Sequence, residues 1–180
     1  MSERGAPPAF HVLAKPTGAA CNLACAYCYF LEKERLYPGS DFRMSEEILE
    51  AFIGQYIRAQ RVPEAVISWQ GGEPTLMGLD FFRRSVEIAQ EKAPRGMRVS
   101  HTLQTNGMLL DDAWCEFLCE HGFLVGLSVD GPRELHDVYR RDKGGGGTFE
   151  RAERAARLMQ RHGVDFNVLC AVSAANAVHP

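Results

Sequence analysis

Residues 21–28 read CNLACAYC and place three cysteines, Cys21, Cys25 and Cys28, in the spacing C-x3-C-x2-C. An extended run at residues 10–16 ends just before them, and an aromatic residue, Tyr27, stands directly before the last cysteine. Thiols this close together, in a chain without a secretory signal, predict a metal or cluster site more readily than a disulfide framework. This octapeptide is therefore the first candidate for a functional site.

Outward from the cysteines, apolar runs typical of strands alternate with amphipathic stretches typical of helices. The expected strands are residues 10–16, 64–70, 97–104, 123–130 and 164–173. The expected helices are residues 44–60, 79–92, 112–120 and 148–163, with Ser45 and Thr148 as N-caps and Gly122 and Gly163 as stops. Because each strand is nearly all apolar, the order predicts an α/β fold in which helices cover a parallel sheet.

Polar residues follow the expected strands at the points where they end. Cys21 follows the first strand, residues 70–73 (QGGE) follow the second and residues 104–107 (QTNG) follow the third. Ser128 and Asp130 close the fourth. Parallel α/β proteins carry their sites at the carboxyl ends of the strands, so we expect these residues to share one functional rim.

Length and charge exclude several classes of protein. The 180 residues suit one domain, and a net charge of −3 gives no reason to expect nucleic acid or an anionic membrane as a partner. No apolar run approaches the ~18 residues of a membrane span, and residues 1–16 lack the apolar core of a signal peptide. The expected location is therefore the cytoplasm, where thiols stay reduced.

The number of nearby thiols limits what the triplet can hold. A structural zinc site uses four ligands, and the remaining cysteines are poor candidates for the fourth. Cys115 and Cys119 are expected to act as small apolar residues of a helix, and Cys170 to be buried in the last strand. A thioredoxin-like pair would leave Cys21 without a purpose. Three thiolates on a four-iron cluster leave one iron open, as a catalytic site requires.

The triplet, the GGEP sequence at residues 71–74 and the parallel β/α order resemble the radical S-adenosylmethionine (SAM) superfamily. Longer stretches are similar to the SPASM-containing anaerobic sulfatase-maturating enzymes of that superfamily, namely residues 15–38, 68–82, 103–114 and 123–149. The resemblance implies a partial (β/α)6 TIM-like barrel with about five parallel strands, truncated before the last strand.

For function, the resemblance implies a [4Fe-4S] cluster and S-adenosylmethionine as cofactors. One electron from the cluster would cleave S-adenosylmethionine to a 5′-deoxyadenosyl radical, which abstracts a hydrogen atom. Enzymes of this family oxidise a Cys or Ser side chain of a sulfatase to formylglycine. The implied partners are therefore a sulfatase polypeptide and a reducing electron donor such as flavodoxin or ferredoxin.

The same resemblance implies roles for individual residues. Cys21, Cys25 and Cys28 would hold the cluster, and Gln70 would face the substrate peptide. The implied cofactor-binding residues are Tyr27, Gly71, Gly72, Glu73, Asn106, Ser128 and Arg140. Within this set, Arg140 matches the residue that binds the methionyl carboxylate, a role that suits a forked and permanently charged donor.

Several of these residues also have a purely structural explanation. The alternatives are a strand-to-helix turn for Gly71 and Gly72, a core position for Tyr27, a strand end for Gln70, a turn at Asn106, and a surface ion pair for Arg140 or its neighbour Arg141. The chain departs from the family at Phe30, where related enzymes often carry a tyrosine near the substrate. Phe30 keeps the ring but lacks the hydroxyl.

The enzymes that the chain resembles continue well beyond this length. They add a further strand and helix, a SPASM domain with auxiliary clusters, and an aspartate proposed as the base. We therefore expect residues 1–180 to form a radical SAM core domain that is incomplete at its C-terminus, with the catalytic base beyond Pro180. Two alternatives stay open: another SPASM-type enzyme that modifies a different peptide, and a non-catalytic metal-binding module.

Overall fold

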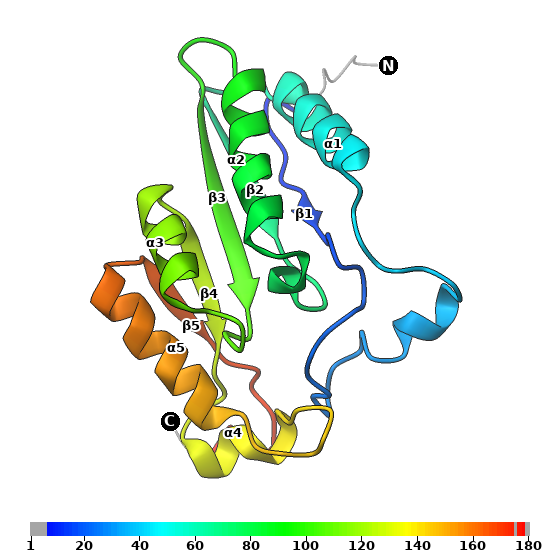
Figure 1. The fold of residues 1–180 in the computed structure, drawn as a ribbon, viewed down its shortest axis with the longest axis vertical. Coiled ribbons are helices and arrows are strands. Elements are labelled where there is room, and N and C mark those ends of the chain that lie inside the picture. The colour runs from blue at the N-terminus through cyan, green and yellow to red at the C-terminus, as the bar shows by residue number, and fades with distance from the viewer. Residues whose placement is uncertain (1–6, 175, 179–180) are drawn as a thin grey trace, which may run out of the picture.

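The computed structural model of the protein describes residues 7–174 and 176–178. Its centre is one sheet in which each strand pairs in parallel with the strand before it, in the order β1-β2-β3-β4-β5 (Figure 1). The strands are β1 (Leu13–Ala14), β2 (Glu64–Trp69), β3 (Arg98–Thr105), β4 (Leu124–Ser128) and β5 (Phe166–Leu169). The predicted α/β fold with five parallel strands is confirmed.

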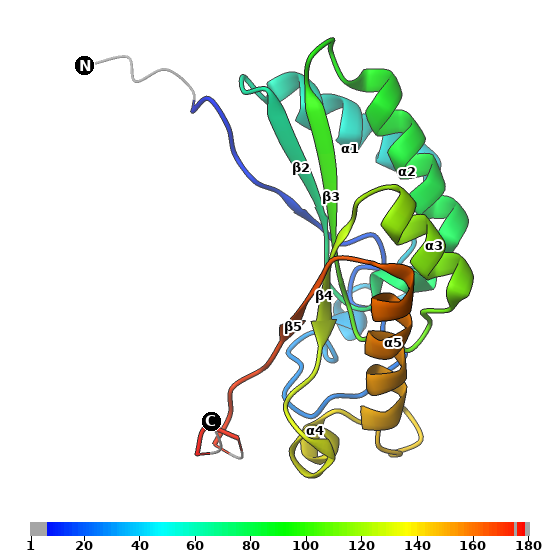
Figure 2. The same cartoon turned by 90° about the vertical axis from the view of Figure 1, so that its left-hand side faces the viewer.

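Helices lie against only one face of this sheet, as the side view in Figure 2 shows. They are α1 (Glu46–Ala59), α2 (Leu79–Lys92), α3 (Asp112–Glu120) and α5 (Phe149–His162). Helix α4 (Arg133–Tyr139) instead packs on α5 beyond the end of β4, and the 3₁₀ turns are η1 (Lys33–Leu36) and η2 (Pro74–Met77). The sequence pattern did not predict α4 or the two 3₁₀ turns. Among the residues that the structure describes, no helix is long and apolar enough to cross a membrane.

Capping residues define where the main helices begin and end. The Ser45 hydroxyl accepts a hydrogen bond from the Ile48 amide and caps α1, as predicted. Gly122 follows the end of α3 with a φ of 60°, and Gly163 ends α5 in the left-handed conformation with a φ of 69°. These signals depend on neighbouring residues only, which is why the helix ends follow from the sequence.

Thr148 is an exception, because its side chain does not cap α5 as predicted. The Thr148 hydroxyl instead donates a hydrogen bond to the Arg140 carbonyl at 2.8 Å. Asp137 supplies the cap in its place, since its Oδ1 accepts from the amides of Thr148 at 2.7 Å and Phe149 at 2.9 Å. The start of α5 is thereby tied to α4, and the two helices together shape one side of the rim.

The core lies between the helices and the covered face of the sheet. Trp69, Phe82 and Phe123 are each at most 1 % exposed and pack edge-to-face around Phe82. Truncation of such a ring to alanine costs roughly 3–5 kcal/mol. On the other face of the sheet, Ser68 and Thr102 are only half-buried. The sheet thus buries one face for stability and leaves a partly polar face open.

Two predictions of buried cysteines are wrong. Cys115 is fully buried in α3 as expected, but Cys119 and Cys170 are exposed. Cys119 lies in the last turn of α3, where its Sγ contacts the Gly163 carbonyl at the surface. Cys170 follows β5, an edge strand whose last three residues are exposed as well. The local sequence does not show which turn or strand the fold leaves uncovered.

Candidate active site

The cysteine segment leaves β1 and crosses the rim at the strand ends (Figure 1). It is fastened there by the chain that follows α4. The Ala24 amide donates a hydrogen bond to the Arg141 carbonyl at 2.8 Å, and the Ala26 amide donates to the Tyr139 carbonyl at 2.9 Å. Two segments far apart in sequence therefore hold the triplet at the rim that the polar pattern predicted.

The thiols of Cys21, Cys25 and Cys28 line one cavity of about 220 Å³. The Cys21 Sγ accepts hydrogen bonds from the Leu23 amide at 3.4 Å and from the Asn106 side-chain amide at 3.7 Å. Burial raises the pKa of Cys21 to about 11 and also raises the pKa of Cys25. N–H donors directed at a sulfur suit a ligand thiolate, and metal binding releases the proton that burial otherwise retains.

Three thiols are the type of ligand that holds an iron–sulfur cluster. Within residues 7–174 and 176–178, no three His, Cys, Asp or Glu side chains are placed to hold one ion together. A cluster binds each thiolate at a different iron, so its ligands need not converge on one point. Apolar side chains pack around the triplet, namely Leu23, Met108, Val129 and Ala152, and they bury Cys25 while Cys21 and Cys28 stay partly exposed.

The glycine loop after β2 packs directly against the backbone that leads into the cysteines. Gly72 has a φ of 53°, and a Cβ atom there would stand 2.2 Å from the Ala20 carbonyl oxygen. The Glu73 amide donates a hydrogen bond to the same oxygen at 2.8 Å. Only glycine lets the backbone at residue 72 come this close to the Ala20 carbonyl. As a result, Gly71 and Gly72 lie in the wall of the cavity.

Glu73 also lines the cavity, but its carboxylate is fully engaged within the protein. Oε1 accepts from the Thr75 amide and from the hydroxyls of Thr75 and Thr105, at 2.6 to 3.1 Å, and Oε2 accepts from the Asn106 amide at 2.8 Å. Burial raises the pKa of Glu73, and these four donors oppose that rise. Glu73 thus acts on the site by joining the loop after β2 to the loop after β3.

The other polar residues predicted for the site line the same cavity. Asn106 is buried, and its side-chain amide donates to Asn22 Oδ1 at 2.8 Å, which turns it toward the cysteine segment. Ser128 is buried at the end of β4, and Gln70 is half-buried directly after β2. All the residues predicted to bind metal, cofactor or substrate are therefore brought together around one cavity.

Asp130 connects two of these residues; it was expected on the rim, but no binding role was predicted for it. Its Oδ2 accepts hydrogen bonds from the Tyr27 hydroxyl at 2.5 Å and from Arg140 Nε at 2.8 Å. Burial raises the pKa of Asp130, but the bonds from Arg140 and Tyr27 outweigh it, so the pKa lies below its ordinary value. Asp130 is therefore a carboxylate that holds Tyr27 and Arg140 beside each other, with the guanidinium 5.5 Å from the Tyr27 ring centroid.

Arg140 and Arg141 are clearly distinguished by their positions. Arg140 lines the cavity with a side chain that is 12 % exposed, and its positive end is paired with Asp130. Arg141 is exposed, and its Nε donates to the Asp137 carbonyl at 3.0 Å. The surface ion pair suggested as an alternative for both residues applies to neither, because the ion pair of Arg140 is buried and Arg141, although exposed, forms no ion pair with a described residue.

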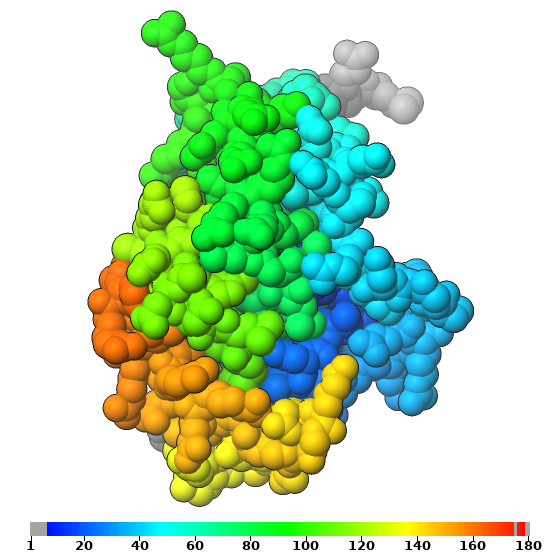
Figure 3. All heavy atoms as spheres, in the orientation of Figure 1, coloured from blue at the N-terminus to red at the C-terminus, as the bar shows by residue number. Residues whose placement is uncertain are grey.

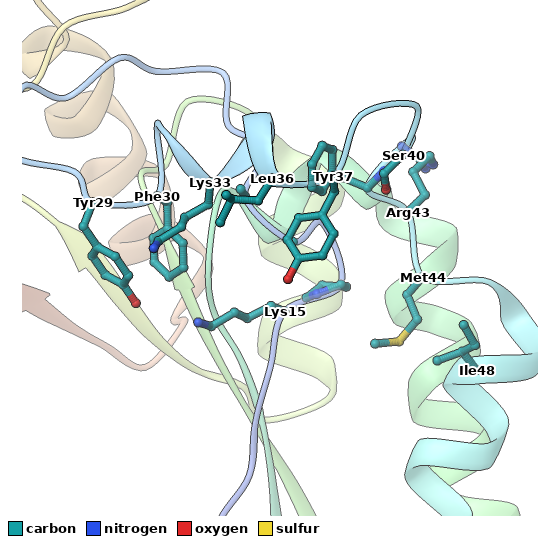
Figure 4. A pocket seen from close by; sticks show the side chains of 14 residues that line it. Lys15, Tyr29, Phe30, Lys33, Leu36, Tyr37, Ser40, Arg43, Met44 and Ile48 are labelled. Atoms are coloured by element: carbon teal, nitrogen blue, oxygen red, sulfur yellow. The ribbon is translucent and has the colours of Figure 1, made fainter.

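A larger cavity of about 620 Å³ adjoins the site and shares Tyr29 and Phe30 with it. This aromatic groove, formed by residues 15–19 and 29–48, belongs to a segment that projects from the side of the molecule (Figure 3). Its charged lining residues are Lys15, Lys33 and Arg43, and Lys15 Nζ lies 4.4 Å from the centroid of the Phe30 ring (Figure 4). The sequence pattern gave no sign of this groove.

Solved structures with the same fold include native anSMEcpe with bound AdoMet and Cp18Cys peptide. It is 39 % identical, with a TM-score of 0.85, over 93 % of this chain and 44 % of that one. SuiB of Streptococcus suis, bound to S-adenosylmethionine, shares the fold at 18 % identity and a TM-score of 0.64. These structures bear out the partial barrel that the resemblance implied.

Curated relatives cover nearly all of this chain as well. The serine-type anaerobic sulfatase-maturating enzyme of Bacteroides thetaiotaomicron is 44 % identical over 94 % of the chain and 41 % of its own length. The cysteine-type enzyme of Clostridium perfringens is 39 % identical over 96 % of the chain and 46 % of its own length. The chain thus spans less than half the length of these relatives.

The sequence profile of the Radical SAM superfamily matches residues 16–172, a span that includes the cysteine triplet, the glycine loop, Ser128 and Arg140. Together with the cavity in which these residues meet, this match shows that the chain belongs to the radical SAM superfamily.

Proposed function

We propose that this chain is part of an enzyme that uses S-adenosylmethionine to oxidise a Cys or Ser side chain of a sulfatase to formylglycine. The observation that carries the proposal is the single cavity lined by the three thiols, the glycine loop, Ser128 and Arg140. Similarity over nearly the whole chain to both serine-type and cysteine-type sulfatase-maturating enzymes supports the choice of substrate.

The residues of the cavity divide the binding of the cofactors between them. Cys21, Cys25 and Cys28 hold the iron–sulfur cluster, and the main chain at Gly71 and Gly72 receives the amino group of S-adenosylmethionine. When bound, the cluster supplies the electron that cleaves S-adenosylmethionine and so initiates hydrogen abstraction. The apolar residues packed around the triplet exclude water from this step.

Further residues orient S-adenosylmethionine within the cavity. Arg140 binds the carboxylate of the methionyl group, and Ser128 lies beside it as a hydrogen-bond partner. Tyr27 faces the adenine side, and Asn106 lies at the junction of the cofactor and the cluster. Glu73 contributes by fixing the loops on which Gly72 and Asn106 stand. Gln70 faces the substrate peptide.

The proposed function also implies a domain assignment, a cellular location, an electron donor and a macromolecular substrate. We propose that residues 1–180 belong to the radical SAM core domain, that the protein works in the cytoplasm, and that a flavodoxin or ferredoxin reduces the cluster. A sulfatase polypeptide is the macromolecular substrate, and neither nucleic acid nor membrane is a partner. The catalytic base belongs to the sequence that the longer relatives carry beyond the matched region.

The test begins with anaerobic reconstitution of the chain with iron and sulfide. Reductant and S-adenosylmethionine are then added, and we expect methionine and 5′-deoxyadenosine to form. For the peptide reaction, the chain is extended with the C-terminal segment of the Bacteroides relative and given a Cys-x-Pro-x-Arg peptide deuterated at the cysteine Cβ. We expect deuterium in the 5′-deoxyadenosine and formylglycine in the peptide.

The matching serine peptide and an alanine peptide are assayed in parallel. Deuterium transfer from the cysteine or serine peptide, with none from the alanine peptide, supports sulfatase maturation. Cofactor cleavage without transfer from either peptide contradicts it and favours an enzyme that modifies another peptide. A colourless protein that retains zinc and cleaves no S-adenosylmethionine indicates a non-catalytic metal-binding module.

A further inference from the structure

The Arg140 side chain leaves two of its nitrogens available at the cavity. Its Nε donates to Asp130 at 2.8 Å, whereas neither Nη has a hydrogen-bond partner among the described residues. Because the guanidinium is planar, the direction of Nε fixes the direction of both Nη groups. Asp130 therefore decides where the remaining donors of Arg140 point.

Asp130 is itself held at three points. Its Oδ1 accepts a hydrogen bond from the Ala171 amide at 2.9 Å, next to the end of β5. Its Oδ2 accepts from Tyr27 as well as from Arg140. Its own backbone amide donates to Nδ1 of His136 in α4 at 3.2 Å. With Asp130 only 2 % exposed, water does not compete effectively for these bonds.

His136 and Thr148 continue these bonds back to Arg140. Since His136 Nδ1 accepts from Asp130, the ring proton lies on Nε2, which donates to the Thr148 hydroxyl at 3.0 Å. The Thr148 hydroxyl in turn donates to the backbone carbonyl of Arg140 at 2.8 Å. Both residues are 1 % exposed. The result is a closed circuit that runs from Asp130 through His136, Thr148 and Arg140 back to Asp130.

We propose that Asp130, His136 and Thr148 form a positioning ring that holds Arg140 at both its backbone and its side chain, so that its free nitrogens face the carboxylate of S-adenosylmethionine. This inference rests on the proposed function, because it assumes that Arg140 binds that carboxylate. Asp130, His136 and Thr148 do not line the cavity and act through Arg140. The ring also explains why Thr148 does not cap α5 with its side chain.

The physical effect of the ring is to order Arg140 before the ligand arrives. An arginine carries large rotamer entropy, which binding would otherwise have to overcome. If one link of the ring is lost, Arg140 keeps its charge but not its fixed direction. We therefore expect affinity for S-adenosylmethionine to fall about tenfold when Thr148 is replaced by valine.

The experiment compares S-adenosylmethionine with decarboxylated S-adenosylmethionine, which lacks the carboxylate. Equilibrium dialysis measures the Kd of both compounds on the anaerobically reconstituted chain with its cluster oxidised, so that neither compound is cleaved. Thr148→Val removes the hydroxyl, and Thr148→Ser restores it. His136→Asn breaks a second link, because it keeps an acceptor for the Asp130 amide but lacks the donor to Thr148. Arg141→Ala is the matched surface control.

We expect Thr148→Val and His136→Asn to bind S-adenosylmethionine about tenfold more weakly, and Thr148→Ser and Arg141→Ala to bind it as the wild type does. All variants should bind the decarboxylated compound within about twofold of the wild type. A purely structural role predicts equal losses for both compounds, and that result would overturn the ring while leaving the proposed function intact. Unchanged affinity in both ring variants would overturn it as well.

The wild type provides the separate check on the proposed function. If the wild type binds both compounds with equal affinity, Arg140 does not hold the carboxylate, and both the assignment of Arg140 and the ring fall. If Thr148→Val does not fold, as judged by circular dichroism, His136→Asn decides alone. The decision is the same: selective loss of affinity for the carboxylate-bearing compound supports the ring, and any other result contradicts it.

Discussion

Asp130 accepts a hydrogen bond from Arg140 Nε at 2.8 Å, in an ion pair whose side chains are only 3 % and 12 % exposed. Substitution of Arg140 by alanine should therefore leave a buried carboxylate without its cation. We expect Arg140→Ala to lower the free energy of unfolding by roughly 3 kcal/mol. Its affinity for S-adenosylmethionine should fall about ten- to a hundredfold, because a charge-assisted hydrogen bond is lost.

Urea unfolding and equilibrium dialysis under anaerobic conditions measure the two effects of Arg140→Ala. Arg141→Ala is the control, and its exposed side chain predicts a change in stability within about 0.5 kcal/mol. The assignment is wrong if Arg141→Ala loses cofactor affinity and Arg140→Ala does not.

The cysteines supply the second prediction. Replacement of Cys21, Cys25 or Cys28 by alanine should abolish the cluster, because each thiolate ligates a different iron. Iron and acid-labile sulfide per chain, measured after anaerobic reconstitution, report the loss. Cys119→Ala is the matched control, since that thiol is free and exposed on α3. Retention of the full iron content by Cys25→Ala, together with loss in Cys119→Ala, would contradict the ligand set.

Gly72 and Gly78 form a pair that separates backbone strain from steric contact. Both have positive φ, 53° and 85°, but a Cβ would meet the Ala20 carbonyl oxygen at Gly72 and no atom within 4 Å at Gly78. Gly78 also has a ψ of 161°, a conformation that is essentially restricted to glycine, so Gly78→Ala should cost about 1–3 kcal/mol of unfolding free energy from backbone strain alone. Gly72→Ala should cost roughly 2–5 kcal/mol, because overpacking is added to the strain.

Urea unfolding of the two glycine variants, followed by measurement of S-adenosylmethionine binding, checks this prediction. Only Gly72→Ala should also weaken cofactor binding, since its loop lines the cavity. A loss of stability in Gly72→Ala that is smaller than the loss in Gly78→Ala would contradict the expected steric contact with Ala20.

His101 supplies a prediction for pH. It is buried, accepts a hydrogen bond from Trp69 Nε1 and stacks on Phe123, and burial lowers its pKa to about 4. The unfolded chain therefore binds a proton at higher pH than the folded chain does. Stability should be complete above about pH 6.5 and should decline by roughly 3 kcal/mol as the pH falls toward 4.

The measurement compares urea unfolding of the wild type and His101→Gln between pH 7 and pH 4, at equal iron content. Glutamine retains an acceptor for Trp69 but does not titrate, so the variant should lose less stability on acidification. His136, whose pKa burial and the nearby Arg140 also lower, is present in both proteins and cancels in the difference. Parallel pH profiles for the two proteins would show that His101 does not contribute.

The parts of the fold that were predicted correctly depend on local sequence. Helix α2 was predicted with its observed ends, because its apolar period and the flanking glycine and alanine are readable within one segment. Strand β1 was expected over residues 10–16 but comprises only Leu13 and Ala14, the residues that find partners on β2. The length of a strand is decided by its neighbour, which the local pattern does not show.

The site was predicted as a set of residues on one rim, and the structure brings that set together. The network among them was not predicted. Asp130 follows β4, and its place on the rim was the one available signal, but its partners Tyr27 and Ala171 are distant in sequence. Local preference predicts Thr148 as a helix cap, whereas its hydroxyl donates a hydrogen bond to the Arg140 carbonyl. Long-range polar contacts override such local preferences.

The backbone hydrogen bonds that join Ala24 and Ala26 to Arg141 and Tyr139 connect the cysteine segment to the residues on either side of Arg140. With the proposed binding residues, the cluster and S-adenosylmethionine would both order this stretch of backbone, the first through the cysteines and the second through Arg140. Ligands that stabilise one arrangement raise each other's affinity by the same factor. We therefore expect air to weaken cofactor binding as well as to destroy the cluster, so that a chain without its cluster has a lower affinity for S-adenosylmethionine. Conversely, a chain saturated with S-adenosylmethionine should lose its iron more slowly in air.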